Sequence, residues 1–280
     1  MCYHLFIKSA KENNITVYDF GEYKEVVIGK LTYHIYNVYE GRSATVVSCE
    51  KDATDVVIPV TIEDGVAVTK VGESAFENCD KLKTVLLPEY DFQRLDNDEL
   101  MFEEIGAFAF AGCTSLEEIT IPLETCFIGK GAFRCCTSLK KVTLESASLI
   151  TLCPYVFAGC TSLVDVTPVA TASEGLFDGC TSLTYLPISS SVQTIENRCF
   201  AHCTALEDVV IRMSVDTIEA LAFRSCANLK KMTFEFPNKW RWISIYSKSG
   251  VFDLTDPYEN AEIFKTMDFD DGILRFVRTW

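Results

Sequence analysis

The 280-residue sequence predicts a β-rich solenoid, in which short structural repeats stack along one axis. Three observations lead to this prediction. The motif Phe-x-x-Cys-x-x-Leu recurs seven times, at spacings of 20 to 34 residues. A stretch with apolar residues at every second position follows most copies, which is typical of a short strand with one buried face. Both ends of the chain lack the motif, so we expect them to cap the stack.

Each copy of the motif belongs to a longer unit of about 23 residues. An aliphatic residue stands five positions before most of the phenylalanines, and the leucine begins the pattern Leu-x-x-Val/Ile-x-Ile/Leu. Such a unit cannot bury its own apolar face, whereas stacked copies form a continuous core. A weaker copy at 53–59 precedes the others, which predicts eight rungs. The seven motif phenylalanines are Phe76, Phe110, Phe133, Phe157, Phe177, Phe200 and Phe223.

The repeat is similar to the BspA-type leucine-rich repeats, whose consensus is close to I-G-x-x-A-F-x-G-C-T-S-L-x-x-V-x-I-P. Residues 105–122 match this consensus nearly throughout, and the resemblance covers about residues 53–234. It implies a right-handed leucine-rich-repeat solenoid with a parallel sheet on the concave face and short helical turns or strands on the other side. It also implies protein recognition, often by surface proteins that adhere to host proteins. Pro168 and Ala172 depart from the pattern, so we expect a local irregularity there.

The repeats divide the chain into three parts. Residues 1–52 are expected to form an N-terminal segment with a β-hairpin cap, because 31–36 and 44–48 alternate in polarity. Residues 53–236 form the solenoid, with one partial and seven full repeats and an acidic insertion at 89–104. Residues 237–280 form the C-terminal cap, in which Trp240 and Trp242 cover the last coil. Within this cap the sequence predicts a helix from Asp256-Pro257 to about Lys265 and a strand at 272–277.

Charge and hydropathy exclude several classes of function. The net charge is −15 and the pI about 4.7, and such a surface repels nucleic-acid phosphates and anionic lipid. No run reaches the roughly 18 apolar residues of a membrane span. The start of the chain lacks the apolar stretch of a secretory signal. These features predict a cytoplasmic location for the chain as written, or a cell-surface or secreted one if a native leader precedes it.

Seven of the 13 cysteines occupy the motif position itself. Free cysteine packs as a small apolar side chain, so we expect a buried ladder of reduced thiols. Parallel stacking holds neighbouring Cβ atoms about 4.8 Å apart, further than the roughly 3.8 Å that a disulfide needs. Cys135 replaces a turn glycine and is the expected exposed thiol. The cluster Cys199-x-x-His202-Cys203 could suggest a metal site or a nucleophile, but both cysteines occupy core positions, which favours a structural role.

The sequence predicts no catalytic, cofactor-binding or metal site. It contains no phosphate-binding loop. Glu118 and Asp165 lie two rungs apart, about 9.6 Å, close to the separation of the carboxylates in inverting glycosidases. Lys141 lies between them and is expected to keep both carboxylates ionised, which removes the general acid. We therefore expect a protein that is not an enzyme.

We expect the binding surface to be the row of outward-facing strand residues on the concave face. Interface energy concentrates in aromatic and arginine anchors, so Tyr185, the one aromatic residue of the row, is the expected centre. The predicted function is a non-enzymatic scaffold that binds another protein, one with a basic patch because the insertion is acidic. The alternative is a carbohydrate-binding or glycoside-active protein that uses the same row. The row comprises Glu118, Lys141, Asp165, Tyr185, Asp208 and Lys231.

Overall fold

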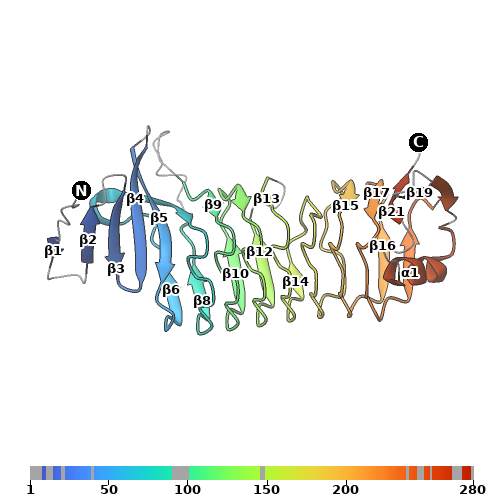
Figure 1. The fold of residues 1–280 in the computed structure, drawn as a ribbon, viewed down its shortest axis with the longest axis horizontal. Helices are drawn as coiled ribbons and strands as arrows, with labels where there is room; N and C mark the ends of the chain where they lie inside the picture. The colour runs from blue at the N-terminus through green and yellow to red at the C-terminus, as the bar shows by residue number, and fades with distance from the viewer. Residues whose placement is uncertain are drawn as a thin grey trace.

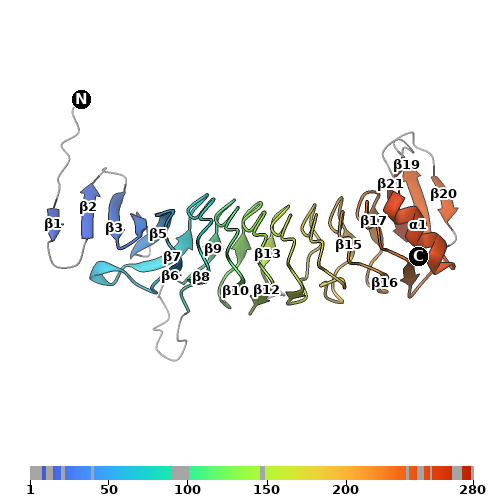
Figure 2. The same ribbon diagram turned by 90° about the horizontal axis from the view of Figure 1, so that it is seen from below.

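The predicted solenoid is confirmed by a computed structural model of the chain. It stacks about seven turns along one nearly straight axis (Figures 1 and 2), with N-terminal strands at one end and a helix at the other. The structure describes residues 8–10, 15–19, 23–38, 41–89, 101–145, 149–237, 240–244, 249–252, 254–266 and 273–278. Most of the acidic insertion therefore lies outside the described residues.

Successive turns contribute short strands to two faces of the solenoid. The first set, which we call the row strands, follows the motif leucines. It comprises β6 (Asp55–Val57), β8 (Thr84–Leu86), β10 (Glu118–Ile121), β12 (Lys141–Leu144), β14 (Asp165–Val166), β16 (Asp208–Ile211) and β18 (Lys231–Phe234). The second set precedes the motif phenylalanines. It comprises β7 (Ala67–Val71), β9 (Glu104–Ile105), β11 (Phe127–Ile128), β13 (Thr151–Leu152), β15 (Thr194–Ile195) and β17 (Thr217–Glu219).

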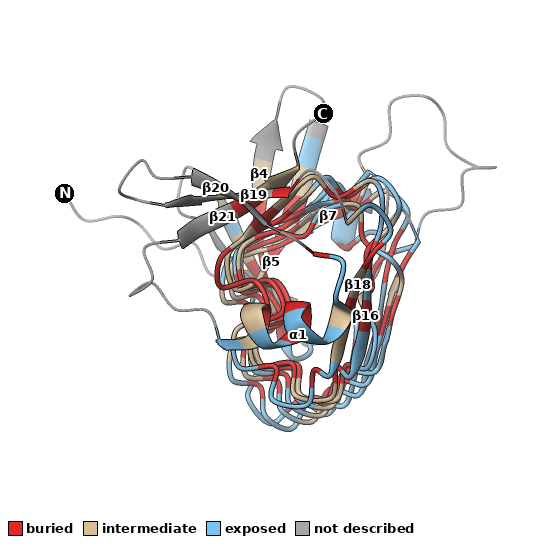
Figure 3. Ribbon diagram, turned by 90° about the vertical axis from the view of Figure 1, so that its right-hand side faces the viewer, coloured by how far each residue is buried: buried red, intermediate tan, exposed pale blue. Residues whose placement is uncertain are grey.

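Most strands of each set pair in parallel with those of neighbouring turns, as the repeats predict. In the row strands, Ile119 pairs with Val142 and Val142 with Val166, and all three side chains are buried. The residues between them alternate outward because strand side chains have a period of two. Seen along the axis, buried residues line the inside of the coil and exposed residues its outer surface (Figure 3).

The N-terminal residues form a larger sheet than the sequence predicts. The expected hairpin is formed by β4 and β5, which pair antiparallel. Three further strands extend it as an antiparallel meander, and β5 pairs in parallel with β7, so the meander continues into the solenoid. The strands are β1 (Lys8–Ala10), β2 (Ile15–Asp19), β3 (Lys24–Ile28), β4 (Leu31–Val38) and β5 (Gly41–Cys49); a short 3-10 helix, η1, spans Glu63–Gly65.

The C-terminal residues cover the last turn with three strands and one helix, β19 (Trp240–Ser244), β20 (Ser249–Phe252), α1 (Pro257–Thr266) and β21 (Ile273–Arg278). Asp256 caps α1, since its Oδ1 accepts the backbone N–H groups of Tyr258 and Glu259. β21 pairs antiparallel with β17 and β19 and so covers the edge of the second strands. Trp240 is buried, and its indole N–H donates to the Phe236 carbonyl at 2.9 Å.

The irregularity expected near Pro168 and Ala172 is present. β14 ends at Val166, and Ala172 takes part in a single bridge with Ile195 instead of a strand. Consequently the row strands β10, β12 and β14 are not hydrogen-bonded to the sheet of β16 and β18, and β13 is not hydrogen-bonded to β15. The two halves of the solenoid are therefore joined at this place without a continuous strand ladder.

A column of stacked phenylalanine rings runs through the solenoid core. The seven motif rings are fully buried, and neighbouring ring centroids lie 4.7 to 5.8 Å apart with nearly parallel planes. Offset stacking of this kind adds to the stabilisation that burial itself provides. Phe264 of α1 closes the column with an edge-on contact to Phe223 at 6.3 Å.

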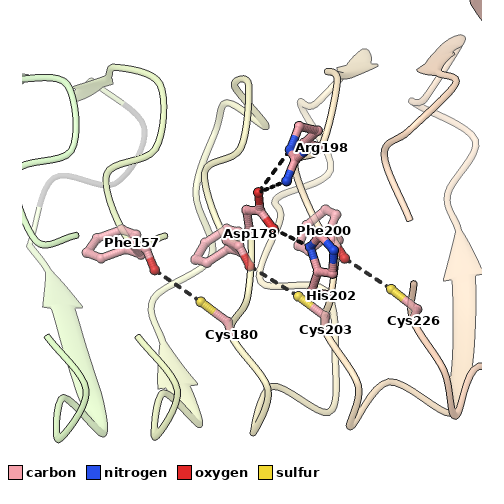
Figure 4. Close-up of polar contacts among 9 residues, drawn as sticks. Phe157, Asp178, Cys180, Arg198, Phe200, His202, Cys203 and Cys226 are labelled. Carbon is pink, nitrogen blue, oxygen red and sulfur yellow. Dashed lines mark hydrogen bonds and ion pairs between the residues drawn. The ribbon is translucent and has the colours of Figure 1, made fainter. Parts of the chain in front are cut away.

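The motif cysteines form the predicted buried ladder beside these rings. The thiols are free and fully buried. From Cys113 onward, each Sγ donates to the phenylalanine carbonyl of the preceding repeat at 3.0 to 3.2 Å. Figure 4 shows the contacts of Cys180, Cys203 and Cys226. The same carbonyl accepts the backbone N–H of the cysteine in its own repeat, as Phe133 does from Cys136. The thiol thus satisfies a second lone pair of a buried carbonyl, which alanine could not do.

Thiol accessibility gives a first testable prediction. In the native protein a maleimide should label Cys126 and Cys135, which are exposed, and label the half-buried Cys153 more slowly. The ladder thiols should react after unfolding because burial shields them. Peptide mapping by mass spectrometry measures both states. A ladder cysteine labelled as fast as Cys135 in the native protein, or one found in a disulfide, would contradict the packing described above.

Candidate functional site

The predicted binding row lies on the outward side of the row strands, which we call the row face. Glu118, Lys141 and Asp165 are aligned in register on β10, β12 and β14, and all three are exposed. The Lys141 ammonium lies 3.9 Å from the Asp165 carboxylate. Asp208 and Lys231 are likewise aligned on β16 and β18. The sequence therefore identified two aligned groups of charged side chains, one on either side of the irregular turns.

Tyr185 has a structural role that the sequence did not reveal. It lies where the row strand of its turn would be, yet this turn has no row strand. Its hydroxyl accepts the Val166 backbone N–H and donates to the Val166 carbonyl, both at 3.1 Å. The side chain thus supplies hydrogen bonds to the free edge of β14 that a neighbouring strand would otherwise supply. The residue remains 39% exposed, so it is available for contact as well.

A second outward row, which the sequence interpretation overlooked, adds apolar surface to the row face. Val57 and Leu86 pair in register on β6 and β8 and are 66% and 62% exposed. Val210 on β16 is also exposed. Apolar residues at outward strand positions were the available signal in the sequence. Such exposed apolar side chains among polar ones are typical of contact surfaces when they adjoin one another.

A shallow hollow lies beside Leu86, where the row strands β8 and β10 are not hydrogen-bonded to one another. Its volume is about 220 Å³, and Glu118 and Lys141 line it together with Thr120 and Thr143. The hollow therefore brings two predicted row residues next to an exposed apolar side chain. This arrangement can hold a side chain of a partner, with polar groups around an apolar contact.

The cluster around Cys199 and His202 is structural, as favoured above. Both Cys199 and Cys203 are fully buried in the core. The His202 side chain is partly exposed and does not lie in the core. Its Nδ1 lies 2.7 Å from the Oδ1 of Asp178, and the Oδ2 of Asp178 accepts a hydrogen bond from Arg198 (Figure 4). Burial raises the pKa of the Cys199 and Cys203 thiols well above the ordinary value, which opposes a role as thiolate ligand or nucleophile.

The described residues contain no group of three or more His, Cys, Asp or Glu side chains placed to hold a metal ion. Within the same residues, no helix has the length and apolar character needed to cross a bilayer.

Stacked short strands, a phenylalanine column and repeated motif turns define a leucine-rich-repeat protein of the β-solenoid kind. The family described as BspA type Leucine rich repeat region matches residues 53–102, 99–174 and 167–263 in six copies. The chain belongs to this family. The resemblance seen in the sequence is therefore confirmed over the repeats.

Solved structures of other repeat proteins are similar to the chain. A leucine-rich-repeat protein of T. pallidum is 24% identical, with a TM-score of 0.47 over 72% of this chain and 80% of that one. One from Bacteroides ovatus is 21% identical, with a TM-score of 0.40 over 74% and 70%. The pneumococcal vaccine antigen PcpA is 16% identical, with a TM-score of 0.41 over 75% and 69%. No curated protein sequence matches the chain.

Proposed function

We propose that the chain is a non-enzymatic scaffold that binds another protein through the row face. The observation that carries this proposal is the combination of Leu86, Glu118 and Lys141 around the hollow between β8 and β10. An exposed apolar side chain ringed by charged and hydroxyl groups has the composition of an interface core and its rim. The family resemblance implies an adhesin-like use of this surface, on a cell surface or after secretion.

The rigidity of the solenoid supports this function. The inward neighbours of the row residues, such as Ile119 and Val142, are locked in the core. The outward side chains consequently start from fixed backbone positions, so a partner meets a small ordering cost from this side. Tyr185, which is held at β14 by its hydroxyl, contributes a pre-ordered aromatic ring to the same face.

Charge indicates the chemistry of the partner. The chain carries a net charge of −15, and the row contributes three carboxylates against the two ammonium groups of Lys141 and Lys231. A partner with a basic patch is therefore favoured, and its association should be faster at low ionic strength. Membranes with anionic lipids and nucleic acids lack this complementarity.

A row variant tests the proposal. Leu86→Ser, Glu118→Ala and Asp165→Ala together should weaken binding of an isolated partner by at least about tenfold, because they remove the apolar contact and two charges. Surface plasmon resonance against a partner captured with the parent protein gives the affinity. Tyr185→Phe should retain most of the binding while lowering stability by about 1 kcal/mol, because the ring stays but its hydrogen bonds are lost.

A control variant carries the same change in charge on other surfaces. Leu149 is 77% exposed, and Asp80 and Glu103 are exposed outside the row face. Leu149→Ser, Asp80→Ala and Glu103→Ala together should bind the partner as the parent does. Equal binding by the row variant and the parent would place the interface elsewhere. Binding to isolated glycans without any protein partner would contradict the proposed function itself.

A further inference from the structure

We propose a second binding surface, on the turns between the second strands and the row strands, that takes an extended acidic peptide segment of a partner. We call it the cationic hollow. Its volume is about 510 Å³, and Lys130, Arg134, Tyr155, Gly159, Asp178 and Arg198 line it. It shares no lining residue with the row face, so the inference goes beyond the function proposed above.

The charge of the cationic hollow is opposite to that of the whole chain. Three of its lining side chains are cationic and one is a carboxylate, although the chain has 40 acidic and 25 basic residues. Lys130 and Arg134 are exposed and form no ion pair within the described residues, whereas other surface lysines, such as Lys140 with Glu117, do. Clustered cations without carboxylate partners produce a positive potential that attracts an anionic ligand.

Arg198 is held in place for such a ligand. Its Nε and Nη2 donate to the Oδ2 of Asp178 at 3.0 and 2.9 Å, while His202 Nδ1 bonds the other carboxylate oxygen at 2.7 Å (Figure 4). Asp178 is only 14% exposed, so it serves as a buried support for both groups. A guanidinium has five N–H donors in a fixed plane. At least two of them therefore remain for a carboxylate of a ligand, in a position already fixed by Asp178.

The hollow exists because small residues occupy the turns between the cations. Gly159 has a φ of +75°, and a Cβ at that position would meet the Cys135 Sγ at 3.1 Å. Tyr155 forms the adjoining wall, and its hydroxyl donates to Glu174 at 2.7 Å. The floor thus leaves room for a ligand backbone that larger residues would fill.

The spacing of the cations selects an extended ligand. Lys130 and Arg134 belong to the third repeat and Arg198 to the sixth, so three rungs, about 14 Å, separate their backbone positions. In an extended peptide, side chains four residues apart point to the same side and lie about 13 Å apart. Two acidic side chains at this spacing can reach both ends of the cationic hollow. A compact anion can contact one end at a time.

Fluorescence anisotropy with a labelled peptide tests the proposal. The probe Ser-Glu-Thr-Val-Thr-Glu places two glutamates four residues apart in a sequence that favours an extended backbone. We expect it to bind at low salt, more tightly than a peptide of the same composition with adjacent glutamates, and to be released as salt increases. A peptide with lysines in place of the glutamates should not bind.

Two double variants, each of which removes two positive charges, distinguish binding at the cationic hollow from a general effect of net charge. Lys130→Gln with Arg134→Gln should weaken binding of the spaced peptide by about tenfold, since charge-assisted hydrogen bonds are lost at one end. Lys140→Gln with Lys230→Gln removes the same charge from lysines that pair with Glu117 and Glu207, and should change binding by less than about twofold.

Three results would overturn the proposal. They are failure of the parent protein to bind the spaced peptide, equal weakening by the two double variants, and full displacement of the peptide by an equal concentration of inorganic sulfate. The row variant should bind the peptide as the parent does. That outcome keeps the two surfaces distinguishable, because loss of partner binding at the row face leaves the peptide assay intact.

Discussion

Raising the pH from 7 to 10 should lower the free energy of unfolding of this protein by roughly 5–10 kcal/mol. The reason is the cysteine ladder. Burial raises the pKa of the Cys113 and Cys226 thiols to about 12, and burial also raises the pKa of four further ladder thiols and of Cys199. The thiols concerned are Cys136, Cys160, Cys180, Cys199 and Cys203.

The sign follows from proton binding in the two states. Below the ordinary thiol pKa of 9.0 both states keep the proton, and the stability is unchanged. Between pH 9 and about 12 the unfolded chain loses protons that the folded chain retains, so stability falls as the pH rises. Each such thiol contributes about 1.4 kcal/mol by pH 10. A hydrogen bond between Cys49 and Cys79 raises the pKa of Cys49 and lowers the pKa of Cys79. The two effects on stability oppose each other, so this pair adds little to the pH dependence.

Urea unfolding at pH 7, 9 and 10 in the presence of a reducing phosphine measures this effect. A single ladder substitution, Cys113→Ala, should reduce the loss of stability between pH 7 and 10 by about 1.4 kcal/mol. Cys135→Ala removes an exposed thiol and should leave that loss unchanged. If Cys113→Ala and the parent show the same pH dependence, ladder thiols are not the cause of the alkaline destabilisation.

The repeats were predictable because the same motif marks the same buried positions in seven repeats. A buried leucine, phenylalanine and cysteine recur at fixed spacing, and Ala172 interrupts the pattern where the strand is interrupted. The meander β1–β3 was not predicted. Its strands have no repeat partner, and a segment such as β3 shows one buried position, Val26, in five residues. Whether such segments form strands depends on pairing with distant parts of the chain, and local alternation says little about that pairing.

The two candidate surfaces also differ in how far the sequence predicts them. Strand alternation predicts that Glu118, Lys141 and Asp165 share one face, and the register confirms their alignment. Strand alternation cannot predict that β8 and β10 are not hydrogen-bonded to one another where the hollow lies beside Leu86. The cationic hollow combines residues of four different repeats at turn positions whose side chains vary from one repeat to the next. No spacing in the sequence marks it, because contact between rungs creates it.

At one place in the solenoid, strand pairing between turns is interrupted on both faces. Between β14 and β16 on one face, and β13 and β15 on the other, the ladders are interrupted. Turn hydrogen bonds such as Phe177 N–H to the Cys199 carbonyl remain, together with the ring of Phe177. This ring stacks 5.7 Å from Phe157 and 5.5 Å from Phe200. Phe177 therefore carries an unusual share of the coupling between the two halves.

Phe177→Ala should lower the free energy of unfolding by about 3–5 kcal/mol, through lost burial and the cavity that it leaves. It should also convert one cooperative transition into two, because a repeat protein is held together by contacts between neighbouring turns. Hydrogen exchange read separately for residues 101–145 and 200–234 measures both effects.

Phe133→Ala is the matched control for the position of the break. Phe133 is as buried as Phe177, and it stacks on Phe110 at 5.3 Å where β9 pairs with β11 and β10 pairs with β12. We expect a similar loss of stability with a single transition there. Two transitions in both variants, or one in both, would show that strand pairing does not set the coupling between turns. A split confined to Phe177→Ala would show that the aromatic column couples the halves where the strand ladders are interrupted.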